Sequence, residues 1–445
     1  MKIFSWLAPL LALCFIVFVA GAFTTRFEVF PYHYLKNPLD AAEALLIREK
    51  GEKVPYAVGA KPLHPEDWAA PSVREPGAVG VRNFNTDKAL SGYTVYTPVA
   101  PGYPIRLIDM QGNTVHEWRL PIEDLAGPRD DGLDLNPGEK ITIAHPRVLE
   151  DGSLLLVLGV PPFYTPWGMG IVKLDKDSNL VWKYMRQAHH DLDLDAAGNV
   201  YGLTHSVVYE PWPGLERIKT PFIDDQVVKL DRNGKEISRT SILEAIQSSP
   251  YQSILQYVNI EWPKGDLLHA NSITYLNEKS AAYFPGADAG DVLLSLRQIS
   301  VIAIMDIEAA TIKWALRGPW YAQHDPDVLD NGNMLIFDNR GDIKNGGTTR
   351  IIEFNPLTLE TLWEYPGDND ERLYTSIYGS QQRLANGNTL ISESNNGRLL
   401  EVTRGGEIVW EYHIPERKTN RKGIEVASVV FGHRFTPEEL PFLRQ

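Results

Sequence analysis

Hydrophobic and polar positions recur from residue 91 onward in a unit of roughly 40 to 50 residues. The second half of each unit is a short apolar run, an aspartate or its equivalent, a turn, and a run that ends in tryptophan, which the third copy lacks. Its six copies begin at Ile105, Ile171, Val227, Ile302, Ile351 and Leu399. The first half is a polar start, a leucine, a glycine-centred turn and an apolar strand, with clear copies beginning at His145, His190, His324 and Gln381.

Two short strands in each half make four strands per unit, which is typical of a β-propeller blade. Asn-Gly and Asp-Gly between apolar runs are strong hairpin signals. Six second halves predict an all-β, six-bladed β-propeller with little helix beyond the first 50 residues. The first of these halves has no partner before it, and we expect a strand near Val429–Phe435 to complete that blade.

The chain begins differently. Ile3–Phe23 is a run of 21 residues without a charge, between Lys2 and Arg26. It is long enough to span a bilayer as a helix, and Ala20–Ala22 has the small-x-small pattern that signal peptidase reads. Residues 1–25 are therefore either a cleaved signal peptide or a retained membrane anchor. Both place the protein in the periplasm or elsewhere outside the cytoplasm, and the second attaches it to the inner membrane.

Residues 26–90 read as a linker with one short helix, and 91–445 as the propeller domain. Asp40–Lys50 has an amphipathic pattern that stops at Gly51, and five prolines follow between residues 55 and 76. Proline at this density rules out a long helix. We see no candidate chemistry in this segment.

Charge and cysteine content narrow the function classes. The chain has 43 Lys and Arg against 57 Asp and Glu, a net charge of −14, whereas proteins bind the nucleic-acid backbone through Lys and Arg. We therefore expect no nucleic-acid partner. Cys14 is the only cysteine, which excludes an intramolecular disulfide and a CxxC metal site.

Histidines recur at one register of the repeat. They stand where a first-half strand begins: His145, the adjacent His189 and His190, His269, and His324. The innermost strand of each blade lines the central channel of a propeller, so these imidazoles are expected to converge at one mouth. The alternative is a structural role for each. The other histidines have no such register and are expected to be ordinary, namely His33, His64, His116, His205, His413 and His433.

An arginine accompanies the histidines. Arg297 lies in a predicted apolar strand, Asp291–Ser300, where its burial is costly unless it meets an anion or forms a salt bridge. Several imidazoles, the amide of Asn271 and a guanidinium suit a tetrahedral oxyanion. The chain has no HxH or HExxH motif, no phosphate-binding glycine loop and no GxSxG elbow. We therefore expect no metal and no cofactor.

Five stretches, taken in order, resemble the arylsulfotransferases of the bacterial propeller type, which do not use adenylyl sulfate donors. The stretches are Asp266–Ile273, Ser295–Arg297, Gln323–Asn339, Tyr378–Ile391 and Val430–Phe435. The resemblance implies ping-pong sulfuryl transfer from an aryl sulfate to a phenol, without a cofactor, through a sulfated histidine. By that resemblance the nucleophile is His324, and His269, Arg297 and His190 share the catalytic site. The register slips by one at His189 and His190, which leaves both open for this position, and His190 is favoured. Asn271, His189 and His145 are assigned to substrate binding.

Some features depart from that family. Residues 26–90 are too short and too rich in proline for the extra N-terminal β domain of its large members, and Asn277–Gly290 is an insertion. Two other functions therefore remain open: a non-catalytic scaffold or ligand-binding propeller, and a hydrolase or lyase of an anionic ester. Donor, acceptor and oligomeric state are left open.

Two expectations concern His324 itself. Strand alternation turns Gln323 and Asp325 to the opposite face. Because only a neutral imidazole is nucleophilic, transfer should fall below about pH 6.5 unless the site shifts that value.

Overall fold

The computed structural model divides the chain into two compact units, Met1–Ala60 and Lys61–Gln445. Of the first unit it describes Phe15, Val17 and Val19, which are helical. In the second it describes residues 69–71, 77–99, 102–125, 127–128, 134–135, 141–159, 168–258, 265–342, 344, 347–367, 372–375, 377–420 and 423–444. The predicted signal or anchor and the predicted helix Asp40–Lys50 therefore lie largely outside the described residues. Within those residues, no helix is both long and apolar enough to cross a membrane.

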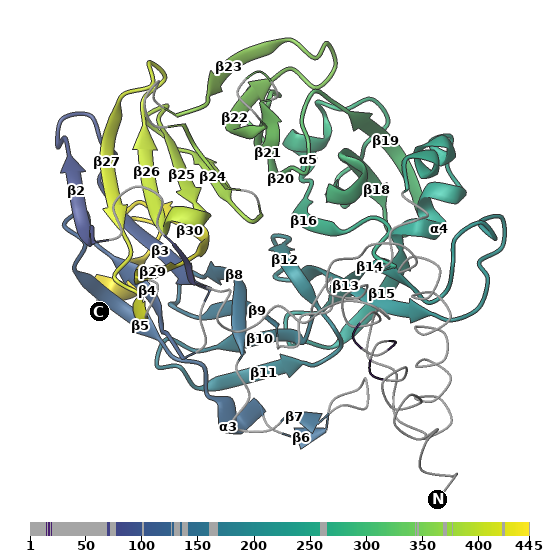
Figure 1. The fold of residues 1–445 in the computed structure, drawn as a ribbon, viewed down its shortest axis with the longest axis horizontal. Coiled ribbons are helices and arrows are strands. Elements are labelled where there is room, and N and C mark those ends of the chain that lie inside the picture. Colours follow the sequence, from purple (N-terminus) through teal and green to yellow (C-terminus); the bar gives the residue numbers. More distant parts are fainter. Residues whose placement is uncertain are drawn as a thin grey trace, which may run out of the picture. The chain divides into compact units, whose positions relative to one another are not determined.

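Six antiparallel sheets surround a central axis in the second unit, as Figure 1 shows. The prediction of an all-β, six-bladed propeller is therefore confirmed. Each blade is a meander, and its first strand is the one nearest the axis. The innermost strands are β30 (Val429–Phe435), β8 (Thr142–Val148), β12 (His189–Leu194), β16 (Ala270–Tyr275), β20 (His324–Val328) and β24 (Ser380–Arg383).

The other three strands of each blade follow outward from the axis. The second strands are β3 (Tyr93–Pro98), β9 (Leu154–Gly159), β13 (Val200–Val208), β17 (Val292–Leu296), β21 (Met334–Asp342) and β25 (Thr389–Glu393). The third strands are β4 (Ile105–Ile108), β10 (Gly170–Leu174), β14 (Phe222–Leu230), β18 (Val301–Asp306), β22 (Thr348–Phe354) and β26 (Arg398–Val402). The outermost strands are β5 (Thr114–Trp118), β11 (Leu180–Tyr184), β15 (Glu236–Ser241), β19 (Thr311–Arg317), β23 (Thr361–Tyr365) and β27 (Ile408–His413).

One blade combines strands from far apart in the chain. Its order is β30-β3-β4-β5, and β30 pairs antiparallel with β3 from Tyr93 opposite Phe435 to Pro98 opposite Val429. The expected closure by the strand near Val429–Phe435 is confirmed. This pairing closes the ring, because the C-terminal end of the chain supplies the innermost strand of the blade that β3 begins.

Few elements lie outside the blade pattern. β2 (Gly80–Phe84), in the segment predicted as a linker, adds a fifth strand outside β27. β1 (Ala69–Pro71), β28 (Arg417–Asn420) and β29 (Gly423–Ala427) form a separate three-stranded sheet, and β6 (Gly127–Pro128) pairs with β7 (Asp134–Leu135). The described helices are short: α3 (Ile122–Leu125), α4 (Ile242–Gln247), α5 (Glu278–Ala281), and the 3-10 turns η2 (Gln252–Tyr257), η3 (Arg297–Ile299), η5 (Ser394–Asn396) and η6 (Pro441–Arg444).

The recurring aspartates and tryptophans have structural roles. Asp109 Oδ1 accepts hydrogen bonds from the backbone N–H groups of Gln111 and Asn113, which forms the turn between β4 and β5. Four tryptophans of the outermost strands donate a hydrogen bond to a carbonyl of the adjoining blade. Trp118 donates to the Gly152 carbonyl at 3.0 Å and Trp410 to the Met110 carbonyl at 2.9 Å. These contacts join neighbouring blades, so neither residue type needs a catalytic explanation.

The hydrophobic core lies between adjacent blades. One cluster joins Leu155 and Ile171 of one blade to Val200 and Val228 of the next. Every blade therefore contributes apolar side chains to the blades on both sides. The innermost strands are held rigidly by this packing, which positions the residues that face the axis.

Trp410→Phe should lower the free energy of unfolding by about 2–3 kcal/mol, because the buried Met110 carbonyl loses its donor. Trp410 is fully buried, and the Arg434 guanidinium lies 4.7 Å from its ring centroid. Urea unfolding would measure the change. Trp182→Phe is the matched control, because that partly exposed tryptophan makes a similar bond to the Arg232 carbonyl at 3.2 Å. Equal losses in the two variants would contradict the role assigned to burial.

Candidate active site

Each innermost strand that carries a predicted site histidine is interrupted by a β-bulge near its start. The register shifts lie between Ile143 and Pro146, His189 and Leu192, Ala270 and Ser272, and His324 and Asp327. Bulges redirect side chains and are common beside active sites. The backbone φ is positive at His190 (57°), His269 (52°) and Asp325 (51°). The alternation of side chains between the two faces of each strand is therefore interrupted where the strand enters the site.

A small cavity lies at this end of the innermost strands. Its volume is about 40 Å³, a few times the roughly 10–15 Å³ that one water needs. All six innermost strands contribute to it, either directly or through the loop before the strand. The lining residues are Ala144, His145, His190, Asp191, Asn271, Ser272, His324, Asp325, Tyr378, Gly379, Ser380, Val430 and Phe431. A cavity of this size suits a compact polar group.

The hydrogen bonds of His324 define its tautomer. Asn339 donates through Nδ2 to the carbonyls of Thr375 and Tyr378, at 2.8 and 2.7 Å. The Asn339 Oδ1 is thereby turned toward His324 Nδ1 at 2.7 Å and accepts a hydrogen bond from its N–H. Nε2 of His324 is left with its lone pair. Burial, followed by the charge of Arg297, lowers the pKa of His324 to about 3, so the ring is neutral at physiological pH.

Two more imidazoles lie close to His324. The rings of His190 and His269 are 4.9 Å apart. Nδ1 of His269 donates to Asp266 Oδ2 at 2.5 Å. Burial, with the neighbouring His269, lowers the pKa of His190 well below its ordinary value. Three imidazoles thus share one region of low polarity.

Arg297 lies at the end of a strand and not within one. The strand expected over Asp291–Ser300 stops at Leu296, and the 3-10 turn η3 begins at Arg297. The turn leaves the sheet because the N–H groups of Arg297 and Gln298 bond to the carbonyls of His269 and Leu268. This correction matters for the site, since it moves the side chain from the sheet face to the axial end of the blade.

The guanidinium of Arg297 has no hydrogen bond or ion pair with any residue that the structure describes. Burial lowers its pKa, and the nearby Asp266 charge opposes that effect. In turn, the Arg297 charge lowers the pKa of both His190 and His324. Arg297 is partly buried, and a desolvated guanidinium without a partner is costly, so this side chain is suited to receive an anion. The salt bridge that was the alternative from sequence is not present in the described part of the chain.

Asn271 is positioned between two blades. Its Nδ2 donates to the Gln323 carbonyl at 2.9 Å, directly before His324. Its Oδ1 is buried without a donor among the described residues. The amide therefore presents an unmet acceptor and a second N–H at the cavity that it lines.

The structure brings the predicted site residues together, except that His189 does not line the cavity. His145, His190, Asn271 and His324 line the cavity, and His269 and Arg297 adjoin them. His189 was assigned to substrate binding, but it is fully buried and does not line the cavity. The bulge in β12 inserts one more residue than that in β20. This difference is why the sequence register slips by one at these two histidines.

Other residues of the site were not expected. Asp325 lines the cavity although alternation placed it on the opposite face, because the bulge in β20 redirects it. Asp191 accepts from His145 Nδ1 at 2.8 Å. Tyr378 and Phe431 complete the wall, and both lie in stretches that carry the family resemblance. His205 and His433 were expected to be ordinary histidines. The His205 ring contacts that of His189, and His433 lies near His145.

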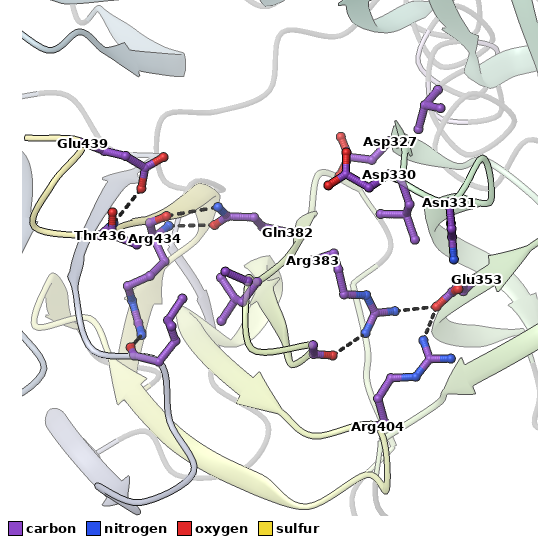
Figure 2. A pocket seen from close by; sticks show the side chains of 16 residues that line it. Asp327, Asp330, Asn331, Glu353, Gln382, Arg383, Arg404, Arg434, Thr436 and Glu439 are labelled. Atoms are coloured by element: carbon purple, nitrogen blue, oxygen red, sulfur yellow. Dashed lines mark hydrogen bonds and ion pairs between the residues drawn. The ribbon is translucent and has the colours of Figure 1, made fainter. Parts of the chain in front are cut away.

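A larger hollow lies at the other end of β20. It measures about 820 Å³ and is lined by Asp327 and Val328, whereas His324 and Asp325 line the small cavity. Figure 2 shows Arg383 and Arg404 converging on one carboxylate, Glu353. Both guanidinium groups are therefore already paired with a carboxylate, unlike that of Arg297. Across the described residues, no group of three or more His, Cys, Asp or Glu could hold a metal ion.

Comparison with known proteins gives a family and several structural neighbours. A family model described as arylsulfotransferase (ASST) matches residues 145–415, a segment that contains the five residues His190, His269, Asn271, Arg297 and His324. No curated protein matches the chain significantly. A protein of unknown function from Bacteroides caccae shares 13% identity over 73% of this chain and 94% of its own, with a TM-score of 0.45. A catalytically inactive virginiamycin B lyase from Staphylococcus aureus, solved with quinupristin, shares 14% identity over 80% of this chain and 98% of its own, with a TM-score of 0.40.

Proposed function

We propose, from the premise that this chain belongs to the arylsulfotransferase (ASST) family, that it moves a sulfuryl group from an aryl sulfate to a phenol through a sulfated His324. The observation that carries the proposal is the state of His324. Its Nδ1 proton is held by Asn339, and its ring is buried and neutral. A neutral imidazole with a defined free Nε2 is the nucleophile that this chemistry requires.

In the first half-reaction, the Nε2 lone pair of His324 forms a bond to sulfur as the bond from sulfur to the aryl oxygen breaks. The phenolate leaves and takes a proton from a neighbouring imidazole. The Nδ1 proton stays on His324, so the sulfated ring carries a positive charge beside its anionic group. The Oδ1 of Asn339, already 2.7 Å from Nδ1, stabilises that charge as an acceptor.

Arg297 and Asn271 supply the electrostatic part of the mechanism. Sulfuryl transfer resembles phosphoryl transfer in spreading negative charge over three equatorial oxygens. The unpaired guanidinium offers a planar fork of donors to these oxygens. Because the site is buried, the donors are preorganised and act in a region of low dielectric.

In the second half-reaction, an acceptor phenol loses its proton to the same imidazole and attacks the sulfur. The bond between His324 Nε2 and sulfur breaks, and the neutral nucleophile is restored. No proton is gained or lost over the full cycle. A water in place of the phenol would make the protein a hydrolase of the same donor.

The substrates and the location of the protein belong to the same proposal. Donor and acceptor are small aromatic molecules, and no cofactor is required. The uncharged run Ile3–Phe23 supports an extracytoplasmic, periplasmic location, with the propeller either released or anchored to the inner membrane.

Intact-mass measurement after addition of an aryl sulfate, without acceptor, tests this function. We expect the protein to gain the mass of one sulfuryl group, located on His324 by peptide mapping, and to lose it when a phenol is added. Continuous release of free sulfate without acceptor would identify a hydrolase. A protein that gains no mass with any aryl sulfate would contradict the proposal and leave the propeller as a binding module.

A further inference from the structure

A second histidine lies behind His190, buried away from the cavity. The Nδ1 atoms of His189 and His190 are 2.8 Å apart, so one of them donates a proton to the other. Nε2 of His189 faces Asp225 Oδ1 at 3.5 Å. The ring of His205 packs on His189 with a centroid distance of 5.3 Å. A line of polar groups thus leads from the cavity to a carboxylate inside the blade.

Asp225 is a buried carboxylate with little compensation. Its Oδ2 accepts from the Ala270 N–H at 2.9 Å, which anchors it beside His269. Its Oδ1 and the Nε2 of His189 are both buried without a hydrogen bond, although they face each other. The adjacent Asp224 is protonated more readily than usual, because burial raises its pKa to about 6. Since an uncompensated buried carboxylate is costly, Asp225 is suited to receive an N–H from Nε2 of His189, which faces it.

The proton between the two imidazoles has two positions. When His189 is an imidazolium, its Nδ1–H donates to His190 Nδ1, and His190 carries its own proton on Nε2, toward the cavity. When His189 is neutral, His190 keeps the proton on Nδ1 and its Nε2 is unprotonated, while His189 keeps an N–H toward Asp225. In both states His190 is neutral, in agreement with its lowered pKa. The pair can therefore switch His190 between acid and base without placing charge beside Arg297.

We propose that His189 and Asp225 form a proton relay behind His190, which acts as the general acid and base of sulfuryl transfer. As the phenolate leaves, His190 Nε2–H gives it a proton, and His190 Nδ1 takes a proton from the His189 imidazolium. The Asp225 charge stabilises that imidazolium beforehand. When the acceptor phenol attacks, its proton goes to His190 Nε2, and the Nδ1 proton returns to His189. The relay rests on the sulfo-His324 reaction proposed above.

The other histidine–carboxylate pairs of the site lack this connection. Asp266 accepts directly from His269, and Asp191 from His145. His189 and His190, in contrast, share a hydrogen bond between two imidazoles. This hydrogen bond links His190, at the cavity, to His189, whose positive charge the Asp225 carboxylate stabilises.

The dependence of His324 sulfation on the leaving group tests the relay. A leaving phenol of ordinary acidity needs a proton, whereas a nitrophenol leaves readily as its anion. We expect Asp225→Asn, which keeps an acceptor for the Ala270 N–H, to slow sulfation by phenyl sulfate about 100-fold or more. With nitrophenyl sulfate the loss should be about tenfold or less. His189→Asn, which keeps a hydrogen bond to His190, should behave in the same way.

Rapid-quench intact-mass measurement gives the single-turnover rate for each donor, and Asp266→Asn is the matched control. Its loss should be the same for both donors. Equal losses for both donors in the Asp225 and His189 variants would mean a structural role and overturn the relay. A steep leaving-group dependence in Asp266→Asn would transfer the acid role to His269. If the unaltered protein is never sulfated on His324, the proposed function fails, and the relay fails with it.

Discussion

His324→Asn should lower turnover with an aryl sulfate donor and a phenol acceptor by at least about 10⁴-fold, the scale expected when a nucleophile is removed. The variant should also gain no mass from the donor. Asn keeps a polar side chain of similar length at the cavity but has no nucleophilic nitrogen. The propeller should remain folded, because His324 faces the axis and packs little of the core between blades. Steady-state kinetics and intact mass would measure the two effects.

His116→Asn is the matched control. His116 lies on the outermost strand β5 and bonds through Nε2 to the Lys176 carbonyl, far along the blade from the cavity. The His116→Asn variant should keep full activity. If His324→Asn retained transfer within about tenfold, which is roughly 1.4 kcal/mol of barrier, the nucleophile would be His190 or His269, or the displacement would be direct.

The pH dependence of His324 sulfation follows from the direction of its pKa shift. Burial and the Arg297 charge lower that pKa to about 3, so the ring is already neutral above about pH 4. Protonation of the nucleophile therefore does not reduce its sulfation near pH 6.5, the value for an unperturbed histidine. The single-turnover rate with nitrophenyl sulfate should stay level from pH 7 down to the point where the protein unfolds.

Arg297→Lys should reduce transfer by about 10²-fold, similar to the loss of one oxyanion donor in other enzymes. A lysine keeps the charge but replaces the planar fork with a point charge. Because the guanidinium has no partner in the described part of the chain, no compensating ion pair is broken, and stability should change little. The loss should appear in the rate of His324 sulfation, measured by mass.

Arg119→Lys is the control for this change. Arg119 is exposed and pairs with Glu117 on the protein surface, so its replacement should leave transfer unchanged. Equal losses in the two variants would remove Arg297 from the role of oxyanion ligand.

The repeat allowed the fold and the place of the site to be predicted from sequence. Alternating apolar runs and Asp-Gly or Asn-Gly turns are local features, and they depend little on distant parts of the chain. Six copies of such a unit therefore define six blades. Equivalent positions of a closed ring meet at the same end of its axis, so the convergence of His145, His269 and His324 followed from their register.

Other properties of the site depended on contacts between residues far apart in sequence. His190 faces the cavity and His189 does not, because the bulge in β12 is one residue longer than that in β20. Asp325 lines the cavity because the bulge in β20 redirects its side chain. A bulge reflects how a strand fits its neighbours, and the local alternation of residues does not reveal it.

The sequence by itself determined the all-β blades, their number and the set of imidazoles at one mouth, since short-range patterns and ring symmetry suffice for these. The tertiary structure alone decided the chemical state of each group. The Asn339 amide, held by two carbonyls from a loop after it, assigns the free nitrogen of His324. Arg297 has no hydrogen bond or ion pair with the described residues, although the charge of Asp266 lies near it. Both results depend on which groups meet through space in a buried region, where a single missing or added partner changes a pKa or a proton position.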